Sequence, residues 1–138
     1  MGGTWDRRRS LSIAIGGTAG AGLRWAVMTS FDAGLFPWPV LMLNVAGSAL
    51  LGVLLAEEWD HPAARLALHD AGAIGFCGGL TTFSTFAVEV VDLARSGHVL
   101  VAGVYSAASV AAALVAVVGG ALLLRRLRAL SLPVEERP

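Results

Sequence analysis

Residues 78–86 read GGLTTFSTF and lie at the centre of an apolar stretch, where a plain membrane helix would carry leucine, isoleucine and valine. Two adjacent glycines and two β-branched threonines lower helix propensity, so an unwound turn is one interpretation. Carbonyl groups freed at membrane depth must be buried, hydrated or bound to a cation, and a buried Na⁺ site is one outcome. The other interpretation is a continuous helix whose hydroxyls donate hydrogen bonds to carbonyls one turn earlier. The residues alone leave both interpretations open.

Four long segments, including the one around residues 78–86, are nearly free of charge. A bilayer core of about 30 Å needs about 20 apolar residues per helix. We therefore expect membrane-spanning helices at about residues 10–31, 33–56, 71–91 and 98–124. The connections between them are too short for an extramembrane domain. The sequence predicts an all-α membrane protein in which residues 1–138 form a single four-helix membrane domain.

The composition excludes a soluble domain, because 56% of the 138 residues are hydrophobic and 14% are charged, against roughly 25% charged in soluble domains. The formal net charge is zero, so no basic surplus is available to bind nucleic acid through counterion release. The single cysteine, Cys77, cannot form an internal disulfide, and no cysteine or histidine spacing resembles a zinc site. No nucleophile and base are paired by spacing, so we do not expect an enzyme. The expected surroundings are membrane lipid.

The arginines are distributed unevenly. An even number of crossings places both termini and the middle loop on one side of the membrane. That side carries eight of the ten arginines, while Arg24 and Arg95 lie near the other side. Because cytoplasmic loops carry an excess of basic residues, this distribution predicts both termini in the cytoplasm.

Small residues recur every four positions in the first span, as in the pair Gly16 and Gly20. This spacing lets helix backbones approach closely within a membrane. Four helices of this size form a thin bundle with little room for an internal pathway. We therefore expect close helix packing and oligomerisation.

Several polar or aromatic side chains within the spans have two interpretations each. Asn44 either bonds to a neighbouring helix or forms part of a pore wall. Phe83 and Phe86 share one helix face, where they either pack or direct ring edges at an anion. Tyr105 and Ser109 offer hydroxyl donors on one face of the fourth span. Arg24, near the end of the first span, either attracts anions to a vestibule or extends its charged head to the membrane surface.

Three blocks of the sequence together resemble a known family. They are residues 16–25 (GGTAGAGLRW), residues 43–52 (LNVAGSALLG) and residues 75–86 (GFCGGLTTFSTF). Their order and spacing, in a chain of this length and span count, are similar to those of the CrcB/Fluc family of fluoride-specific ion channels. The resemblance covers residues 16–119, so only the two tails lie outside it.

This resemblance implies a fold and a function. The fold is an antiparallel dimer of four-helix subunits, with the third helix of each broken near its centre. The function is passive export of F⁻ across the bacterial plasma (inner) membrane, which lowers cytoplasmic fluoride toxicity. An antiparallel homodimer requires a chain that inserts both ways, whereas the arginines here are strongly biased. The expected partner is therefore a second copy of the chain or an oppositely oriented paralogue.

The resemblance also implies roles for individual residues. A structural Na⁺, which is not transported, is held at the dimer centre by backbone carbonyls that map to Gly78 and Thr81. The vestibule arginine maps to Arg24. The fluoride pathway maps to the asparagine, the two phenylalanines and the fourth-span hydroxyls, and the third span adds two hydroxyl donors without fixed charge. The pore residues are then Asn44, Phe83, Phe86, Ser84, Thr85, Tyr105 and Ser109.

Two other classes compete with the channel. A small dual-topology multidrug or cation exporter also has four short helices, but it needs a membrane-embedded carboxylate for proton exchange, and the first span has no acidic residue. A non-transporting membrane scaffold would explain the small-residue spacing. It would not explain the polar residues at 78–86.

Overall fold

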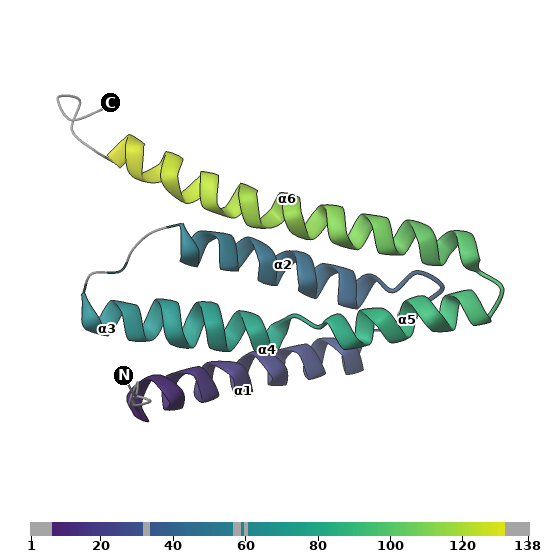
Figure 1. Ribbon diagram of the computed structural model, residues 1–138, viewed down its shortest axis with the longest axis horizontal. Helices are drawn as coiled ribbons and strands as arrows, with labels where there is room; N and C mark the ends of the chain where they lie inside the picture. Colours follow the sequence, from purple (N-terminus) through teal and green to yellow (C-terminus); the bar gives the residue numbers. More distant parts are fainter. Residues whose placement is uncertain (1–6, 32–33, 57–58, 60, 132–138) are drawn as a thin grey trace, which may run out of the picture.

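The computed structural model describes residues 7–31, 34–56, 59 and 61–131. Within these residues the chain is helical apart from turns and one interruption, and it contains no strand (Figure 1). The helices are α1 (Arg7–Ser30), α2 (Trp38–Leu55), α3 (Pro62–Ala64), η1 (Arg65–Cys77), α4 (Gly78–Leu80), α5 (Phe83–Arg95) and α6 (Val99–Ser131). The all-α prediction is confirmed. The elements α3, η1, α4 and α5 follow one line in Figure 1 and correspond to the third predicted span.

This third segment begins at Pro62, earlier than the span expected from residue 71. Pro62 occupies the first helical position, and the Nδ1 atom of His61 accepts a hydrogen bond from the N–H of Ala63 at 3.3 Å. The following element, η1, is wound as a π-helix. Asp70, the charged residue before the apolar run, lies inside η1 because it is paired with other side chains. Its charge therefore does not end the helix.

The helix is interrupted between α4 and α5. Thr81 and Thr82 have extended backbones, with φ and ψ of −79° and 155° at the first and −148° and 122° at the second. Thr82 then becomes the N-cap of α5, because its side chain accepts a hydrogen bond from the N–H of Thr85 at 3.2 Å. The interruption lies within the GGLTTFSTF stretch, just after its two glycines.

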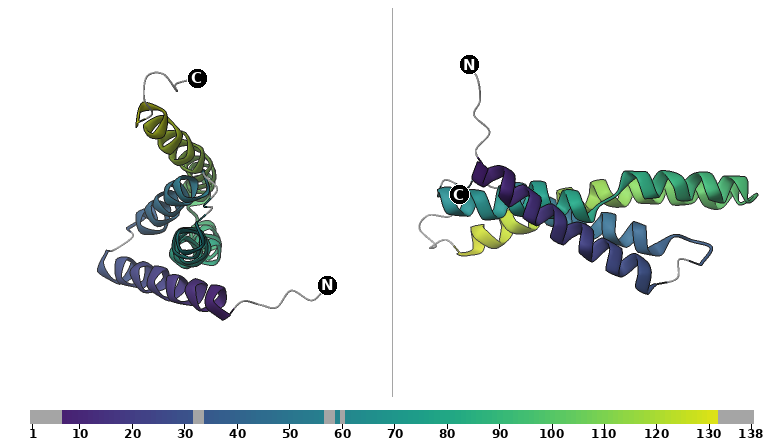
Figure 2. Two further views of the ribbon diagram at one scale, coloured as in Figure 1. Left: turned by 90° about the vertical axis from the view of Figure 1, so that its left-hand side faces the viewer. Right: turned by 90° about the horizontal axis from the view of Figure 1, so that it is seen from below.

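The helices are arranged as an open arc. α2 packs against both α6 and η1, and α1 packs against η1 and α4. Over the residues that the structure describes, α1 and α6 do not contact each other. The end-on view in Figure 2 shows α6 and α1 on opposite sides, with α2 and the third segment between them. The starts of α1 and α3 and the end of α6 lie at one end of the molecule (Figure 1).

The contact between α1 and the third segment is made through glycines on both sides. A methyl group at Gly16 would overlap the carbonyl of Ala71, and one at Gly79 would overlap the carbonyl of Gly17. At Gly75 an added methyl carbon would lie 2.6 Å from the carbonyl oxygen of Ile13. The two backbones therefore touch directly. The close packing expected from Gly16 and Gly20 is present, because Gly20 lies against Phe76 in the same way.

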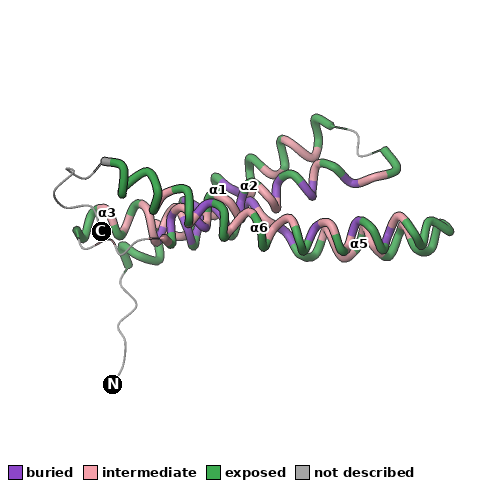
Figure 3. Tube along the Cα trace, turned by 90° about the horizontal axis from the view of Figure 1, so that it is seen from above, coloured by how far each residue is buried: buried purple, intermediate pink, exposed green. Residues whose placement is uncertain are grey.

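The outer faces of the helices are largely apolar and exposed. Figure 3 shows buried positions where the helices run together and exposed ones along their outer sides. Three described segments are long and apolar enough to cross a membrane: Trp38–Leu55, Pro62–Arg95 and Val99–Leu130. α1 is long enough, at about 36 Å for its 24 residues, but its arginines and glycines make it less apolar.

Candidate functional site

The interruption after α4 is held open by one side chain from α2. The Nδ2 atom of Asn44 donates to the carbonyl of Thr82 at 3.1 Å, and the N–H of Thr82 donates to Oδ1 of Asn44 at 2.8 Å. The amide of Asn44 thus pairs with the extended backbone as a neighbouring strand would. These two bonds satisfy backbone groups that the helix break leaves without helical partners. Asn44 therefore fixes the conformation of the break from across the helix interface.

A cluster of hydroxyls completes the cap at the start of α5. Oγ1 of Thr82 lies 3.0 Å from Oγ1 of Thr85 and 3.3 Å from Oγ of Ser84. On the other side of the break, Oγ1 of Thr81 donates to the carbonyl of Cys77 at 2.9 Å. Ser84 and Thr85, which we predicted to line the pore, thus lie around the N-cap residue Thr82.

Two backbone carbonyls at the break do not receive the N–H donors that a continuous helix would give them. In a continuous helix the Gly78 carbonyl would accept a bond from the N–H of Thr82, but that N–H donates to Asn44. The carbonyl of Thr81 accepts a hydrogen bond from Nη1 of Arg24 at 3.0 Å. Arg24, predicted at a vestibule, is therefore placed by the structure against the interruption itself.

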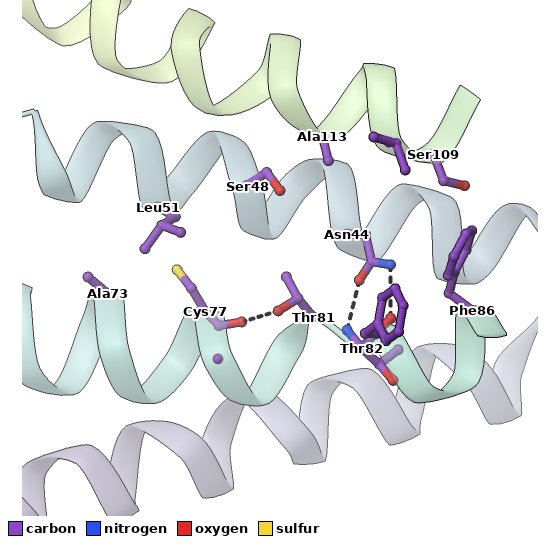
Figure 4. A pocket seen from close by; sticks show the side chains of 13 residues that line it. Asn44, Ser48, Leu51, Ala73, Cys77, Thr81, Thr82, Phe86, Ser109 and Ala113 are labelled. Atoms are coloured by element: carbon purple, nitrogen blue, oxygen red, sulfur yellow. Dashed lines mark hydrogen bonds between the residues drawn. The ribbon is translucent and has the colours of Figure 1, made fainter. Parts of the chain in front are cut away.

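A cavity of about 360 Å³ opens beside the interruption (Figure 4). It is lined by Asn44, Ser48, Leu51, Ala73, Cys77, Gly78, Thr81, Thr82, Phe83, Phe86, Ser109, Val110 and Ala113. No charged side chain lines it among the residues that the structure describes. In Figure 4, Leu51, Ala73 and Cys77 lie toward one end, while Phe86 and Ser109 lie toward the other, beyond Asn44. The described lining is thus uncharged and combines apolar and polar side chains.

Ser109 is the one described residue whose side-chain oxygen is buried and has no hydrogen-bond partner. By contrast, the neighbouring Ser106 donates to the carbonyl of Ala102 at 2.8 Å. A buried hydroxyl without a partner is costly, by about 1 to 3 kcal/mol. Ser109 is also one of the residues that line the cavity.

Three aromatic rings form a chain beside the cavity. The centroids of Phe83 and Phe86 are 5.7 Å apart, and those of Phe86 and Tyr105 are 5.3 Å apart. Tyr105 is fully buried and its hydroxyl donates to Oε2 of Glu89 at 2.6 Å. Phe83, in contrast, is 79% exposed. The three rings therefore form a row from the buried Tyr105 to Phe83, which is exposed on the surface of the subunit.

The structure brings together four of the predicted pore residues, because Asn44, Phe83, Phe86 and Ser109 all line the cavity. Tyr105 does not line it but contacts it through Phe86. Sequence reasoning assigned no role to Thr82. A threonine three residues before Thr85 at the start of a helix is an N-cap signal, so Thr82 was recognisable. The contact of Glu89 with Tyr105 was not predictable, because the two residues lie on different helices.

Comparison with known proteins identifies the family of this chain. The family described as "CrcB-like protein, Camphor Resistance (CrcB)" matches residues 11–121. The chain belongs to this CrcB-like family. The resemblance that the three sequence blocks indicated is thereby confirmed.

Named relatives of this CrcB-like chain cover most of its length. The "Fluoride-specific ion channel FluC" of Bordetella bronchiseptica is 40% identical over 104 residues, which are 75% of this chain and 81% of the relative. The "Fluoride-specific ion channel FluC 1" of Nitrobacter hamburgensis is 39% identical over 122 residues, or 83% of this chain and 94% of the relative. The "Fluoride-specific ion channel FluC" of Idiomarina loihiensis is 40% identical over 114 residues, which are 80% of this chain and 88% of the relative.

The CrcB-like match contains the whole candidate site, from Arg24 to Ala113. The same region holds or overlaps the three described segments that can cross a membrane. This CrcB-like chain is therefore a multi-pass membrane protein.

Proposed function

We infer that the chain is a fluoride-specific ion channel and not an enzyme. The observation that carries this inference is the similarity to proteins named as fluoride-specific channels across most of both chains. The uncharged cavity at the helix break supports it. F⁻ is small and strongly hydrated, so a selective path has to replace water with close hydrogen-bond donors. Neutral donors suit conduction, because a site must bind the ion and also release it.

The donors on the cavity wall fit this task. Ser109 has an unpaired hydroxyl, and the amide nitrogen of Asn44 has a second N–H beyond the one bound to Thr82. The ring edges of Phe83 and Phe86 carry positive partial charge. In this proposal F⁻ passes the edges of the two rings and the donors of Asn44 and Ser109. Ser84, Thr85 and Tyr105 support the path from the cap of α5 and from α6.

The multidrug or cation exporter gains no support from this arrangement. Such a protein needs a carboxylate in its cavity to exchange protons for substrate. The described cavity lining contains none, and the carboxylate of Glu89 is engaged by Tyr105. The channel explains the uncharged lining, whereas the exporter does not.

We propose that the active form is an antiparallel dimer in the bacterial plasma membrane, with the third helix of each subunit broken at the interruption. A second copy of the chain is the preferred partner, and an oppositely oriented paralogue is the alternative. Two observations support a partner on this face. Phe83 is 79% exposed, and the space over Gly78 is open for at least 4 Å around an added methyl carbon. A partner on this face would cover both positions.

A structural Na⁺ fits the oxygen atoms at the break. Gly78 and Thr81 offer backbone carbonyls, which are the hard oxygen ligands that alkali cations prefer, and the helical partner of the Gly78 carbonyl is diverted to Asn44. The Thr81 carbonyl already accepts a bond from Arg24, so it would share its second lone pair with the ion. Two carbonyls from one chain leave the ion incompletely surrounded, and a partner would supply two more.

The Na⁺ proposal predicts that assembly depends on the cation. Replacing Na⁺ with N-methylglucamine during purification should shift the protein from dimer to monomer, because the larger ion does not fit between the carbonyls. The measurement is the dimer fraction by single-molecule photobleaching in liposomes at matched ionic strength. An identical dimer fraction in both salts would contradict the proposed Na⁺ site.

The channel itself is tested with liposomes that contain only this purified chain. F⁻ efflux is followed with a fluoride electrode, and Cl⁻ release from matched liposomes is the control. Fast F⁻ efflux with little Cl⁻ release is the expected result and establishes the homodimer as sufficient. F⁻ efflux that appears only after an oppositely oriented paralogue is added establishes the heterodimer. Absence of efflux in both preparations would overturn the channel assignment.

A further inference from the structure

Arg24 binds the helix break from the α1 side. Its Nη1 atom donates to the carbonyl of Thr81 at 3.0 Å. Arg24 lies on α1, which packs against α4, the element that ends at the break (Figure 1). Asn44 binds the next residue, Thr82, from α2. Two helices therefore hold two consecutive residues of the break, one through a charged donor and the other through a neutral amide.

The two carbonyls of the proposed Na⁺ site differ in what they offer an ion. The Gly78 carbonyl has lost its helical donor, because the N–H of Thr82 donates to Asn44. The Thr81 carbonyl instead accepts a bond from Arg24. A carbonyl oxygen has two lone pairs. An ion at Thr81 therefore shares its ligand oxygen with the guanidinium group.

Two cations that bind one oxygen atom repel each other. They lie well within the Debye length of about 8 Å, and charges in partly buried positions are screened less than exposed ones. Arg24 and Thr81 are both partly buried. At the effective dielectric constant of a protein, this repulsion exceeds the net contribution of one hydrogen bond. Arginine stays charged at every working pH, so a change in pH does not relieve the repulsion.

We propose that Arg24 sets the Na⁺ concentration at which two subunits assemble. The inference rests on the Na⁺ site proposed above. In the single subunit, the guanidinium group supplies the Thr81 carbonyl with a partner before any ion is bound. Na⁺ then binds against the positive charge of Arg24 in each subunit that contributes a carbonyl. The coupling is reciprocal, so an ion at this oxygen also weakens the bond between Arg24 and Thr81.

The test measures the Na⁺ concentration that gives half of the maximal dimer fraction. The dimer fraction is determined by single-molecule photobleaching of the full chain in liposomes, and N-methylglucamine keeps the ionic strength constant. Arg24→Gln removes the charge but keeps an N–H donor, whereas Arg24→Lys keeps the charge. Arg95→Gln is the matched control, because it removes one exposed arginine from the end of α5, away from the break.

Arg24→Gln should assemble at a Na⁺ concentration about tenfold lower than the unmodified chain, because one repelling charge per subunit is gone. Arg24→Lys and Arg95→Gln should keep the Na⁺ requirement of the unmodified chain. The same requirement in all four proteins would overturn the inference. A higher requirement in Arg24→Gln would overturn it too, since Arg24 would then support the ion instead of opposing it.

A second neutral variant separates the charge of Arg24 from its hydrogen bond. Arg24→Met has neither a charge nor a donor, and it should lower the Na⁺ requirement in the same direction as Arg24→Gln. It also serves if Arg24→Gln does not fold, which the unfolding temperature in detergent shows. Opposite changes in the two neutral variants would assign the effect to the hydrogen bond and contradict a role for the charge.

The unmodified chain distinguishes failure of this inference from failure of the Na⁺ site. A dimer fraction that does not depend on Na⁺ in the unmodified chain would contradict the Na⁺ site and the role of Arg24 together. Assembly that depends on Na⁺ equally in every variant would contradict the role of Arg24 alone. The F⁻ efflux of the unmodified chain remains the separate test of the channel.

Discussion

Two contacts hold the third helical segment in place, and they do so by opposite means. Against α1, the segment packs through glycines, so that backbone meets backbone with no side chain between them. Against α2, the interruption is held by the side chain of Asn44, whose amide takes over hydrogen bonds that the helix has lost. The contact with α1 therefore has no room for added atoms. The contact with α2 loses its hydrogen bonds when the Asn44 side chain is removed.

The largest effect is expected from adding atoms at the glycine contact. Gly16→Val should destabilise the protein by about 3 kcal/mol, because the new side chain overlaps the Ala71 carbonyl and both helices must separate. Gly22→Val is the control, since nothing lies within 4 Å of a methyl carbon at that position of the same helix. Thermal unfolding in detergent measures the difference. Equal loss of stability in the two variants would show that the contact is looser than described.

Removing atoms from the other contact should cost somewhat less stability but nearly all function. Asn44→Ala leaves the N–H and carbonyl of Thr82 without their partners, at about 2 kcal/mol in total. It also removes a donor from the cavity, so F⁻ efflux from liposomes should fall steeply. Ser48→Ala, from the same cavity wall, is the control and should keep most of the efflux. Unchanged efflux for Asn44→Ala would limit Asn44 to a structural role.

A substitution at the exposed ring should separate function from folding. Phe83→Ile should reduce F⁻ efflux about tenfold through loss of the ring edge, with little change in unfolding temperature because Phe83 is 79% exposed. Phe31→Ile applies the same change to another exposed phenylalanine, at the end of α1. Both effluxes and both unfolding temperatures are measured in parallel. Equal efflux from the two variants would take Phe83 out of the pathway.

The smallest effect on F⁻ efflux is expected from removing the hydroxyl of Ser109, which has no hydrogen-bond partner. Ser109→Ala should lower F⁻ efflux about threefold, in line with one hydrogen bond to the ion. The same variant should be slightly more stable in detergent, because a buried oxygen without a partner is removed. Ser106→Ala removes a hydroxyl that already has a partner and should not lower efflux. If both serine variants conduct like the unmodified chain, Ser109 does not bind the ion.

The sequence predicted the helices well because a membrane imposes a simple requirement of length and apolarity. It also drew attention to residues 78–86, whose glycines and threonines oppose a helix, but the residues alone did not decide between a break and a continuous helix. It did not predict the pairing of Asn44 with Thr82, because that contact depends on the register between two helices far apart in the chain. For the same reason it did not predict the pairing of Asp70 with Arg9, which lies within the part of the third segment that precedes the predicted span.

The pairing of helices in this arc has a consequence for how the protein is made. The most extensive packing joins α1 to η1 and α2 to α6, so each helix is paired with the next but one in the chain. During synthesis, α1 enters the bilayer before η1 has been made. In the same way, α2 enters before α6 has been made. Packing between consecutive helices is less extensive. Insertion therefore has to hold the arginine-bearing and glycine-rich α1 without its main partner until the third segment is made, and α2 until α6 is made.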